Sequence, residues 1–260
     1  MNSTKTVSLG EALARTPARS NPARFLYAAF ASLLLVATLV GFQQFYLHGK
    51  AYPGREIVPQ AKLLVIAHGV AMSSWIVLFV VQPLLIVGAN RRLHMALGKI
   101  GAVLATCMVV LGLRVPIEVT RYGPEFPLWG LTRRQFMAVP IFSISMFAVF
   151  VAIGIWNRRR PDIHRPMMFL ATLSIVAAAM DRITALPPLY ADSVWGRVFG
   201  PFFPSLIIGA LFLVVKWLLT RSFDRYLAAG YTALVAVNAL TLVVAPSEPW
   251  GRFAAFLVGS

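Results

Sequence analysis

The sequence has little of what soluble enzymes and metal proteins use. It contains one cysteine, Cys107, so neither a disulfide framework nor a thiolate metal site can form. Its four histidines are too few for the histidine-rich boxes of membrane di-iron oxygenases. No nucleophile motif, zinc-binding motif or phosphate-binding loop is found, and the nine acidic residues form no catalytic pair in the sequence. A hydrolase, an ATP-driven machine and a protein-only metal site are therefore not expected.

Long apolar segments take the place of these motifs. Hydrophobic residues make up 58% of the chain and charged residues 13%, which is typical of a multi-pass membrane protein. A helix needs about 20 apolar residues to cross the hydrocarbon core of a bilayer. Segments near this length are 25–47, 61–88, 98–120, 136–157, 166–186, 201–219 and 227–245. The predicted fold class is an all-α integral membrane helical bundle with about seven transmembrane helices.

The basic residues indicate how the bundle is oriented. The formal net charge of +15 comes from short Lys and Arg clusters between the apolar segments. Such clusters set membrane topology and suit anionic lipid headgroups. No basic groove with interleaved aromatic residues is present, so nucleic acid is not an expected partner. The denser clusters share a side with the N-terminus, which predicts an N-in, C-out arrangement in the cytoplasmic (inner) membrane.

The domain organisation that follows has three parts. Residues 1–24 are polar and basic, and we predict that they form a disordered cytoplasmic tail. Residues 25–246 form a single transmembrane domain in the lipid bilayer. Residues 247–260 are too short to cross and are predicted to be a short interfacial tail.

Two hairpins within the transmembrane domain, 61–120 and 136–186, share several features. In each, an asparagine and two or three arginines precede a histidine that opens the return helix, His94 in the first hairpin and His164 in the second. Each return helix also carries an arginine near its far end. One interpretation is a duplicated helical hairpin core, as in other pseudo-symmetric membrane folds. The other is a chance match over few positions.

Two interpretations of the histidines are open. In one, His94 and His164 are elbow residues that anchor the turns to headgroups, and the second return helix begins at Arg165 because that residue precedes Pro166. In the other, the two imidazoles are axial ligands of a b-type haem, and Arg91 and Arg165 receive its propionates. Haem b is the only cofactor that the sequence suggests.

A second candidate site lies in the predicted outer half of the bilayer. At about 100° per residue, His68, Trp75 and Gln82 share one stripe of their helix, and such a polar stripe usually faces the bundle interior. Arg114 and Glu118 are spaced for an i,i+4 ion pair. Charged groups at this depth indicate either a functional site or a structural polar network. The residues of this candidate site are His68, Trp75, Arg114, Glu118, Asp181 and Arg182.

Three stretches carry a resemblance to known proteins: HGVAMSSWIVLFVVQPLL, RRLHMALGKIG and RRRPDIHRPMMFLATL. Together they resemble a family of uncharacterised bacterial multi-pass membrane proteins over roughly residues 60–185. More distantly, His68, the tryptophan seven residues later and the His94-to-Gly98 motif are similar to the ascorbate-reducible diheme cytochromes b. That family joins its second helix to its fourth, and its third to its fifth, through haem ligands. Only the third-to-fifth pair, His94 with His164, has candidates here, so the resemblance implies at most one haem.

Three functions agree with the sequence. The first is electron transfer by a protein that binds a b-type haem or a quinone. The second is a small-molecule or proton-coupled carrier whose site is formed by the outer-half residues. The third is a non-catalytic accessory subunit of a membrane complex. The sequence does not decide whether the chain is an enzyme, which small molecule it binds or what its oligomeric state is.

Overall fold

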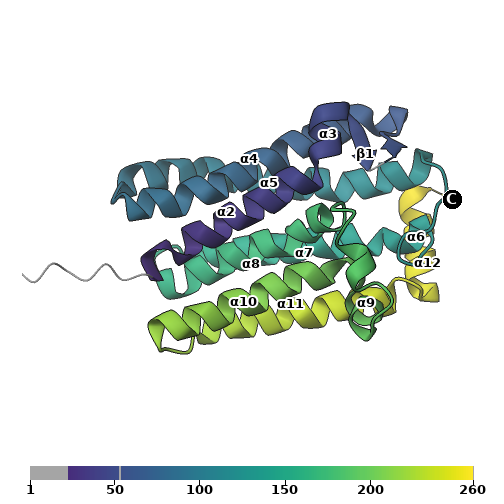
Figure 1. Cartoon of the computed structure of the whole chain (residues 1–260). Coiled ribbons are helices and arrows are strands. Elements are labelled where there is room, and N and C mark those ends of the chain that lie inside the picture. The colour runs from purple at the N-terminus through teal and green to yellow at the C-terminus, as the bar shows by residue number, and fades with distance from the viewer. Residues whose placement is uncertain (1–22, 53, 260) are drawn as a thin grey trace, which may run out of the picture.

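The computed structural model describes residues 23–52 and 54–259, which are almost entirely helical (Figure 1). Six helices in this part of the chain are long and apolar enough to cross a membrane. They are α4 (Lys62–Val87), α5 (Arg91–Tyr122), α7 (Ala138–Trp156), α8 (Pro161–Met180), α10 (Phe203–Thr220) and α11 (Arg225–Val244). The predicted all-α bundle of a multi-pass membrane protein is confirmed. The predicted tail, residues 1–24, lies almost wholly outside the described residues.

The first predicted span is divided in the structure. Helix α2 (Ala23–Gly41) packs against α4 and α8, and the separate short helix α3 (Gln43–His48) follows it. A Cβ atom at Gly41 would lie 2.0 Å from the carbonyl oxygen of Ala179 in α8, so the backbones of α2 and α8 touch where α2 ends. The prediction of one continuous helix over 25–47 is therefore wrong, because a contact with α8 fixes the end of α2.

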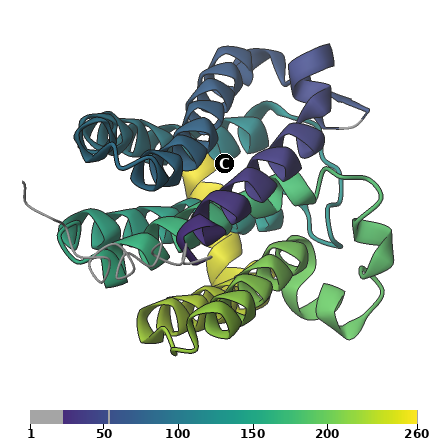
Figure 2. The ribbon, with the colours of Figure 1, turned by 60° about the vertical axis from the view of Figure 1, so that its left-hand side comes forward.

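The helices form three hairpins, α4–α5, α7–α8 and α10–α11, whose short turns lie at the same end of the bundle as the start of α2 (Figures 1 and 2). We call this the basic end, because arginines flank all three turns. The opposite end, the loop end, holds the longer connections (Figure 1). Its elements are α3, β1 (Lys50–Tyr52), β2 (Arg55–Glu56), η1 (Pro59–Ala61), α6 (Arg133–Phe136), η2 (Pro187–Leu189), α9 (Val194–Phe199), η3 (Gly200–Phe202) and α12 (Glu248–Val258).

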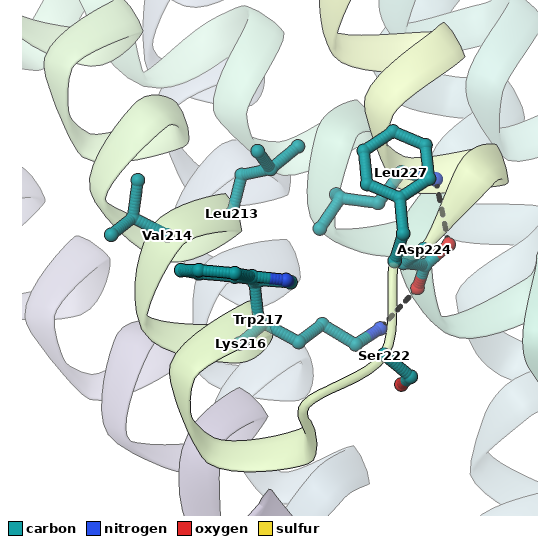
Figure 3. A pocket seen from close by; sticks show the side chains of 8 residues that line it. Leu213, Val214, Lys216, Trp217, Ser222, Asp224 and Leu227 are labelled. Carbon is teal, nitrogen blue, oxygen red and sulfur yellow. Dashed lines mark hydrogen bonds and ion pairs between the residues drawn. The ribbon is translucent and has the colours of Figure 1, made fainter.

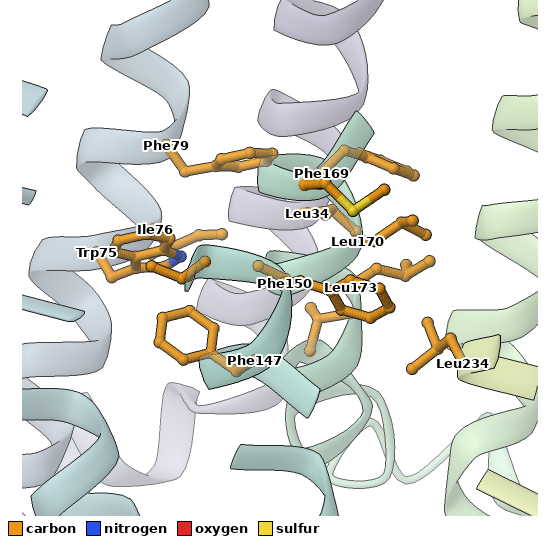
Figure 4. Close-up of a cluster of buried hydrophobic side chains, with 14 of the residues drawn as sticks. Leu34, Trp75, Ile76, Phe79, Phe147, Phe150, Phe169, Leu170, Leu173 and Leu234 are labelled. Carbon is orange, nitrogen blue, oxygen red and sulfur yellow. The ribbon is translucent and has the colours of Figure 1, made fainter. Parts of the chain in front are cut away.

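Helix α8 is the most buried of the six spanning helices and packs against α2, α7, α10 and α11. Its small residues let neighbouring helices approach closely. Phe169 of α8 stacks on Phe212 of α10 with ring centroids 3.9 Å apart, and Phe30 of α2 contacts both rings edge-on. Figure 4 shows apolar side chains of α2, α4, α7, α8 and α11 meeting in this core.

The starts of two spanning helices differ from the predicted boundaries. Helix α5 begins at Arg91, where the Asn90 side chain accepts a hydrogen bond of 3.1 Å from the backbone N–H of Leu93. Helix α8 begins at Pro161 and contains Pro166, so the predicted start at Arg165 is wrong. Pro161 already occupies the first turn, where a missing N–H has no cost. Pro166 loses one backbone hydrogen bond, but it is buried in the core.

The predicted interfacial tail contains a helix that lies across the loop end (Figure 1). This helix, α12, packs against α5 and α6 and buries Trp250 and Ala254. The Trp250 indole donates a hydrogen bond of 3.1 Å to the carbonyl oxygen of Arg134. Phe253 and Phe256 stay exposed on its other side. Helix α12 is therefore an amphipathic cover for the loop end.

Candidate functional site

His94 and His164 lie side by side at the basic end. Helix α5 begins at Arg91 and α8 at Pro161, so each histidine is the fourth residue of its helix. The ring centroids are 6.4 Å apart, and the ring planes are perpendicular. The shared order of residues in the two turns thus places the two imidazoles at equivalent positions that face each other.

The orientation of His164 is fixed by α7. Its Nδ1 lies 2.8 Å from the backbone carbonyl oxygen of Gly154. Because a carbonyl oxygen only accepts, this bond places the imidazole proton on Nδ1 and leaves the lone pair on Nε2. A Cβ at residue 154 would lie 2.9 Å from the sulfur of Met168, so glycine permits this close approach of α7 and α8.

The surroundings of His94 contain polar atoms without partners. The Nδ1 atom of His94 is buried and has no hydrogen bond in the described part of the chain, and the same holds for both polar side-chain atoms of Gln82. Buried polar atoms usually have partners, and those that do not often mark a site for water or a ligand.

The two predicted arginines differ in their relation to the histidine pair. Arg165 directly follows His164 in the chain, is exposed, and makes no hydrogen bond or ion pair with any other described residue. Arg91 is exposed, and none of its described contacts joins it to the pair. The structure therefore brings the two predicted ligand histidines together, and no described hydrogen bond joins either arginine to them.

Asp181 joins three segments of the loop end. Its carboxylate accepts a hydrogen bond of 2.7 Å from the Trp129 indole and one of 3.1 Å from the Tyr52 hydroxyl. Trp129 in turn stacks on Tyr190 with ring centroids 5.5 Å apart. Burial, followed by the Asp181 carboxylate, raises the pKa of Tyr52 from 10.0 to about 12. Burial also raises the pKa of Tyr190. Asp181 thus holds the connections between the spanning helices in place.

Arg182 is also occupied by the loop end. Its guanidinium donates to the backbone carbonyl oxygens of Ala51, at 3.3 Å, and Ala178, at 2.6 Å. It lies 4.7 Å from the centre of the Phe42 ring. The buried Nδ1 of His68 has no hydrogen-bond partner in the described part of the chain, and no described hydrogen bond or ion pair joins His68 to Arg182.

Arg114 and Glu118 belong to a different group. They form the predicted i,i+4 ion pair at 3.2 Å, and 63% of the Arg114 side chain is exposed. Arg121 also pairs with Glu118, at 3.4 Å, and donates to the carbonyl oxygens of Leu257 and Val258 in α12. None of the described contacts links these residues to Asp181. The predicted outer-half cluster is thus divided between two sets of partners.

Trp75 faces the bundle interior, as its stripe predicts. Only 4% of the residue is exposed, and its indole donates a hydrogen bond of 3.1 Å to the Thr172 hydroxyl of α8. Its ring meets Phe147 of α7 edge-on, with centroids 4.9 Å apart. Trp75 therefore ties α4 to the α7–α8 hairpin.

Several polar residues of the structure were not predicted as site residues. Tyr52, Trp129 and Tyr190 are aromatic residues of the long connections at the loop end, and only the fold reveals that they gather around Asp181. Lys216 stands inside an apolar segment, which was a usable signal because a lysine in a spanning helix needs a partner. In the structure it forms an ion pair with Asp224 and a hydrogen bond with Tyr27.

Comparison with protein-family models, with curated proteins and with solved structures finds no match for the chain. Within the described ranges, no three His, Cys, Asp or Glu side chains are grouped as a metal ion would need. A metal held by His94 and His164 would therefore have to bring its remaining ligands with it, as the iron of a haem does.

Proposed function

We propose that this chain is an electron-transfer protein of the cytoplasmic (inner) membrane that binds one b-type haem between His94 and His164. The ring separation is the observation that carries the proposal. A histidine nitrogen binds a transition metal at about 2 Å, and the ring centre lies about 1 Å further back, so two imidazoles on opposite sides of one iron have centroids roughly 6 Å apart. The separation of 6.4 Å agrees with this requirement.

The hydrogen bond between His164 and Gly154 supports the same assignment. Histidines that bind metals commonly donate their other ring N–H to a backbone carbonyl, which fixes both the tautomer and the ring orientation. Here the bond of 2.8 Å leaves Nε2 of His164 as the free lone pair. The elbow interpretation of this residue does not require such a bond.

A small residue follows His94 on α5. Gly98 lies one turn after His94 on the same face of the helix, is exposed, and has nothing within 4 Å of the position that a Cβ would occupy. Helix α5 packs mainly against α4 and α7 rather than α8. Arg165, the residue after His164, would supply a cation to a propionate carboxylate. The residues present therefore fit the group.

The haem would supply a one-electron carrier, and the position of its ligands in the chain would determine where the electrons are exchanged. The histidine pair lies at the basic end, four residues into its helices, so exchange would take place near that membrane surface. His68 has no second histidine opposite it on α7. The chain therefore provides ligands for one haem, and a second electron partner, such as a quinone in the bilayer, would have to bind at the same end.

An absorption spectrum tests the proposal directly. The chain is expressed with added haem, purified and measured before and after reduction with dithionite. We expect the spectrum of a six-coordinate b-type cytochrome, and we expect its loss in His94→Leu and His164→Leu. His68→Leu is the matched control, because it removes another buried histidine and should leave the spectrum unchanged. A wild-type chain without haem absorbance, or equal loss in all three variants, would contradict the proposal.

The carrier hypothesis receives less support from the geometry. Loop residues already occupy Asp181 and Arg182, and Arg114 is largely exposed. Glu118→Gln tests it, because a carrier should lose substrate uptake while the protein still inserts. For an accessory subunit, co-purification with a larger complex is the corresponding measurement.

A further inference from the structure

Two hollows join each other at the basic end. The larger, which we call the basin, has a volume of 670 Å³, within the range of small-ligand sites. The smaller, the groove, has a volume of 190 Å³ and runs along α10 (Figure 3). Both are lined by Lys216, Ser222, Phe223 and Asp224, so they adjoin along these residues, and we refer to the two together as the hollow.

The basin contains more positive charge than its carboxylates can balance. Asp224 pairs with Lys216, and Asp162 pairs with Arg160 at 3.3 Å. Arg165 makes no hydrogen bond or ion pair with the other described residues. Arg225 donates only to the neutral hydroxyl of Tyr226, at 3.0 Å. Two guanidinium groups that line the basin are therefore available to an anion.

The groove is apolar and opens on the outer side of the bundle. Its walls include Leu213, Val214 and Leu227, with Trp217 at one side (Figure 3). Val214 and Trp217 are each about half exposed, and Phe223 is 71% exposed. Val214 and Trp217 lie on α10, which is apolar enough to span the membrane, so hydrocarbon is the natural neighbour of this wall.

Lys216 shows where the hollow lies along the membrane normal. Lys216 lies just before the last turn of α10, and its ammonium group forms an ion pair with Asp224, the residue that caps the start of α11. It also donates a hydrogen bond of 2.8 Å to the hydroxyl of Tyr27 on α2. Lysines in spanning helices extend in this way to bring their charge to headgroup level. The basin therefore lies at the headgroup level, with the groove on the hydrocarbon side.

We infer that this hollow binds one anionic phospholipid, with its phosphodiester in the basin between Arg165 and Arg225 and an acyl chain in the groove. Basic pockets between membrane helices take headgroups of this kind. A soluble anion would use the basin and leave the apolar groove without a function. Arg165 is also the residue proposed to receive a haem propionate, so the inference applies to the chain without haem, and the titrations below use protein expressed without added haem.

Native mass spectrometry of the detergent-solubilised full chain tests the inference. Phosphatidylglycerol, phosphatidylcholine with the same acyl chains, and glycerol 3-phosphate are added in separate titrations. We expect one tightly held phosphatidylglycerol and weaker binding of both other probes. Arg165→Gln and Arg225→Gln should each lower the affinity for phosphatidylglycerol about fivefold, because a basic residue near the headgroups contributes about that factor.

Two further variants separate the parts of the site. Arg158→Gln with Arg159→Gln removes two exposed charges of the same end that do not line the basin, and it should leave the affinity unchanged. Val214→Trp fills the groove and should weaken phosphatidylglycerol but not glycerol 3-phosphate. Equal affinity for the two phospholipids, or an equal loss in the control variant, would overturn the inference. So would tight binding of glycerol 3-phosphate together with no effect of Val214→Trp, which would indicate a soluble anion.

Discussion

The indole of Trp129 donates a hydrogen bond of 2.7 Å to the carboxylate of Asp181, which lies 52 residues further along the chain. Trp129 can reach it because its backbone has a φ of +53° and Gly130, the next residue, has a φ of +73°. This left-handed turn is closed by the bridge between Leu128 and Leu131. One carboxylate at the end of α8 thereby fixes the long connection between α5 and α7.

Replacement of Asp181 by alanine should loosen the loop end. The Trp129 indole would lose its acceptor, and because this donor is only partly buried the cost should lie towards the lower end of the ~1–3 kcal/mol of a fully buried one. Thermal unfolding in detergent, together with limited proteolysis of the connection 123–132, measures the effect. Asp192→Ala removes an exposed carboxylate from the same end and should change stability by less than about 0.5 kcal/mol. Equal effects of the two changes would refute the role given to Asp181.

The pKa of Tyr52 provides a test of the same contact in solution. Burial and the Asp181 carboxylate raise it from 10.0 to about 12, so the folded chain favours the neutral phenol. The resulting contribution to stability is complete below pH 10 and is lost as the pH rises towards about 12. The phenolate absorbance of the wild type minus that of Tyr52→Phe isolates this residue. Asp181→Asn should shift the titration to lower pH without returning it to 10.0, because burial remains.

The hydrogen bond between Trp75 and Thr172 should contribute modestly to the packing of α4 on α8. Comparable bonds between membrane helices contribute about 0.6 kcal/mol on average. A double-mutant cycle with Trp75→Phe and Thr172→Val, measured by unfolding in mixed micelles, isolates the coupling. If the effects of the two changes are additive, the hydrogen bond of 3.1 Å between Trp75 and Thr172 contributes no net stabilisation.

Gly41, the one glycine of α2, should not tolerate replacement. A Cβ there would lie 2.0 Å from the backbone oxygen of Ala179, and neither backbone can yield without separating α2 from α8. Gly41→Ala should therefore destabilise the bundle by about 1–3 kcal/mol or more. Gly251→Ala is the control, because nothing lies within 4 Å of its added methyl group. That change should be neutral or stabilising by up to about 1 kcal/mol through helix propensity.

Much of the fold could be predicted because each spanning helix is specified by its own apolar segment. The facing positions of His94 and His164 also followed from local information, since two similar turns start two helices with the same offset. The i,i+4 pair of Arg114 with Glu118 and the inward direction of Trp75 are likewise consequences of helical periodicity.

What could not be predicted depends on contacts between segments. The sequence indicates the depth of Arg114 and Asp181 in the bilayer but not the direction that each helix face takes. In the structure Arg114 pairs with Glu118, which Arg121 links to α12. Asp181 instead accepts hydrogen bonds from Tyr52 and Trp129, which belong to two different connections. The end of α2 at Gly41 depends on Ala179 of a distant helix. The start of α8 could not be predicted because Pro161 and Pro166 both suit the first turn of a helix, and the sequence alone does not distinguish them.

Among the six spanning helices, the one most enclosed by protein, α8, is also the least apolar. A helix that is surrounded by other helices does not need to be soluble in lipid, so α8 tolerates Asp162, His164 and Arg165 within its first turns. The same property should make it a poor insertion signal on its own. During biosynthesis α8 should therefore enter the bilayer together with α7, the strongly apolar partner that precedes it, and an isolated α8 segment should pass through the translocon instead of stopping in it.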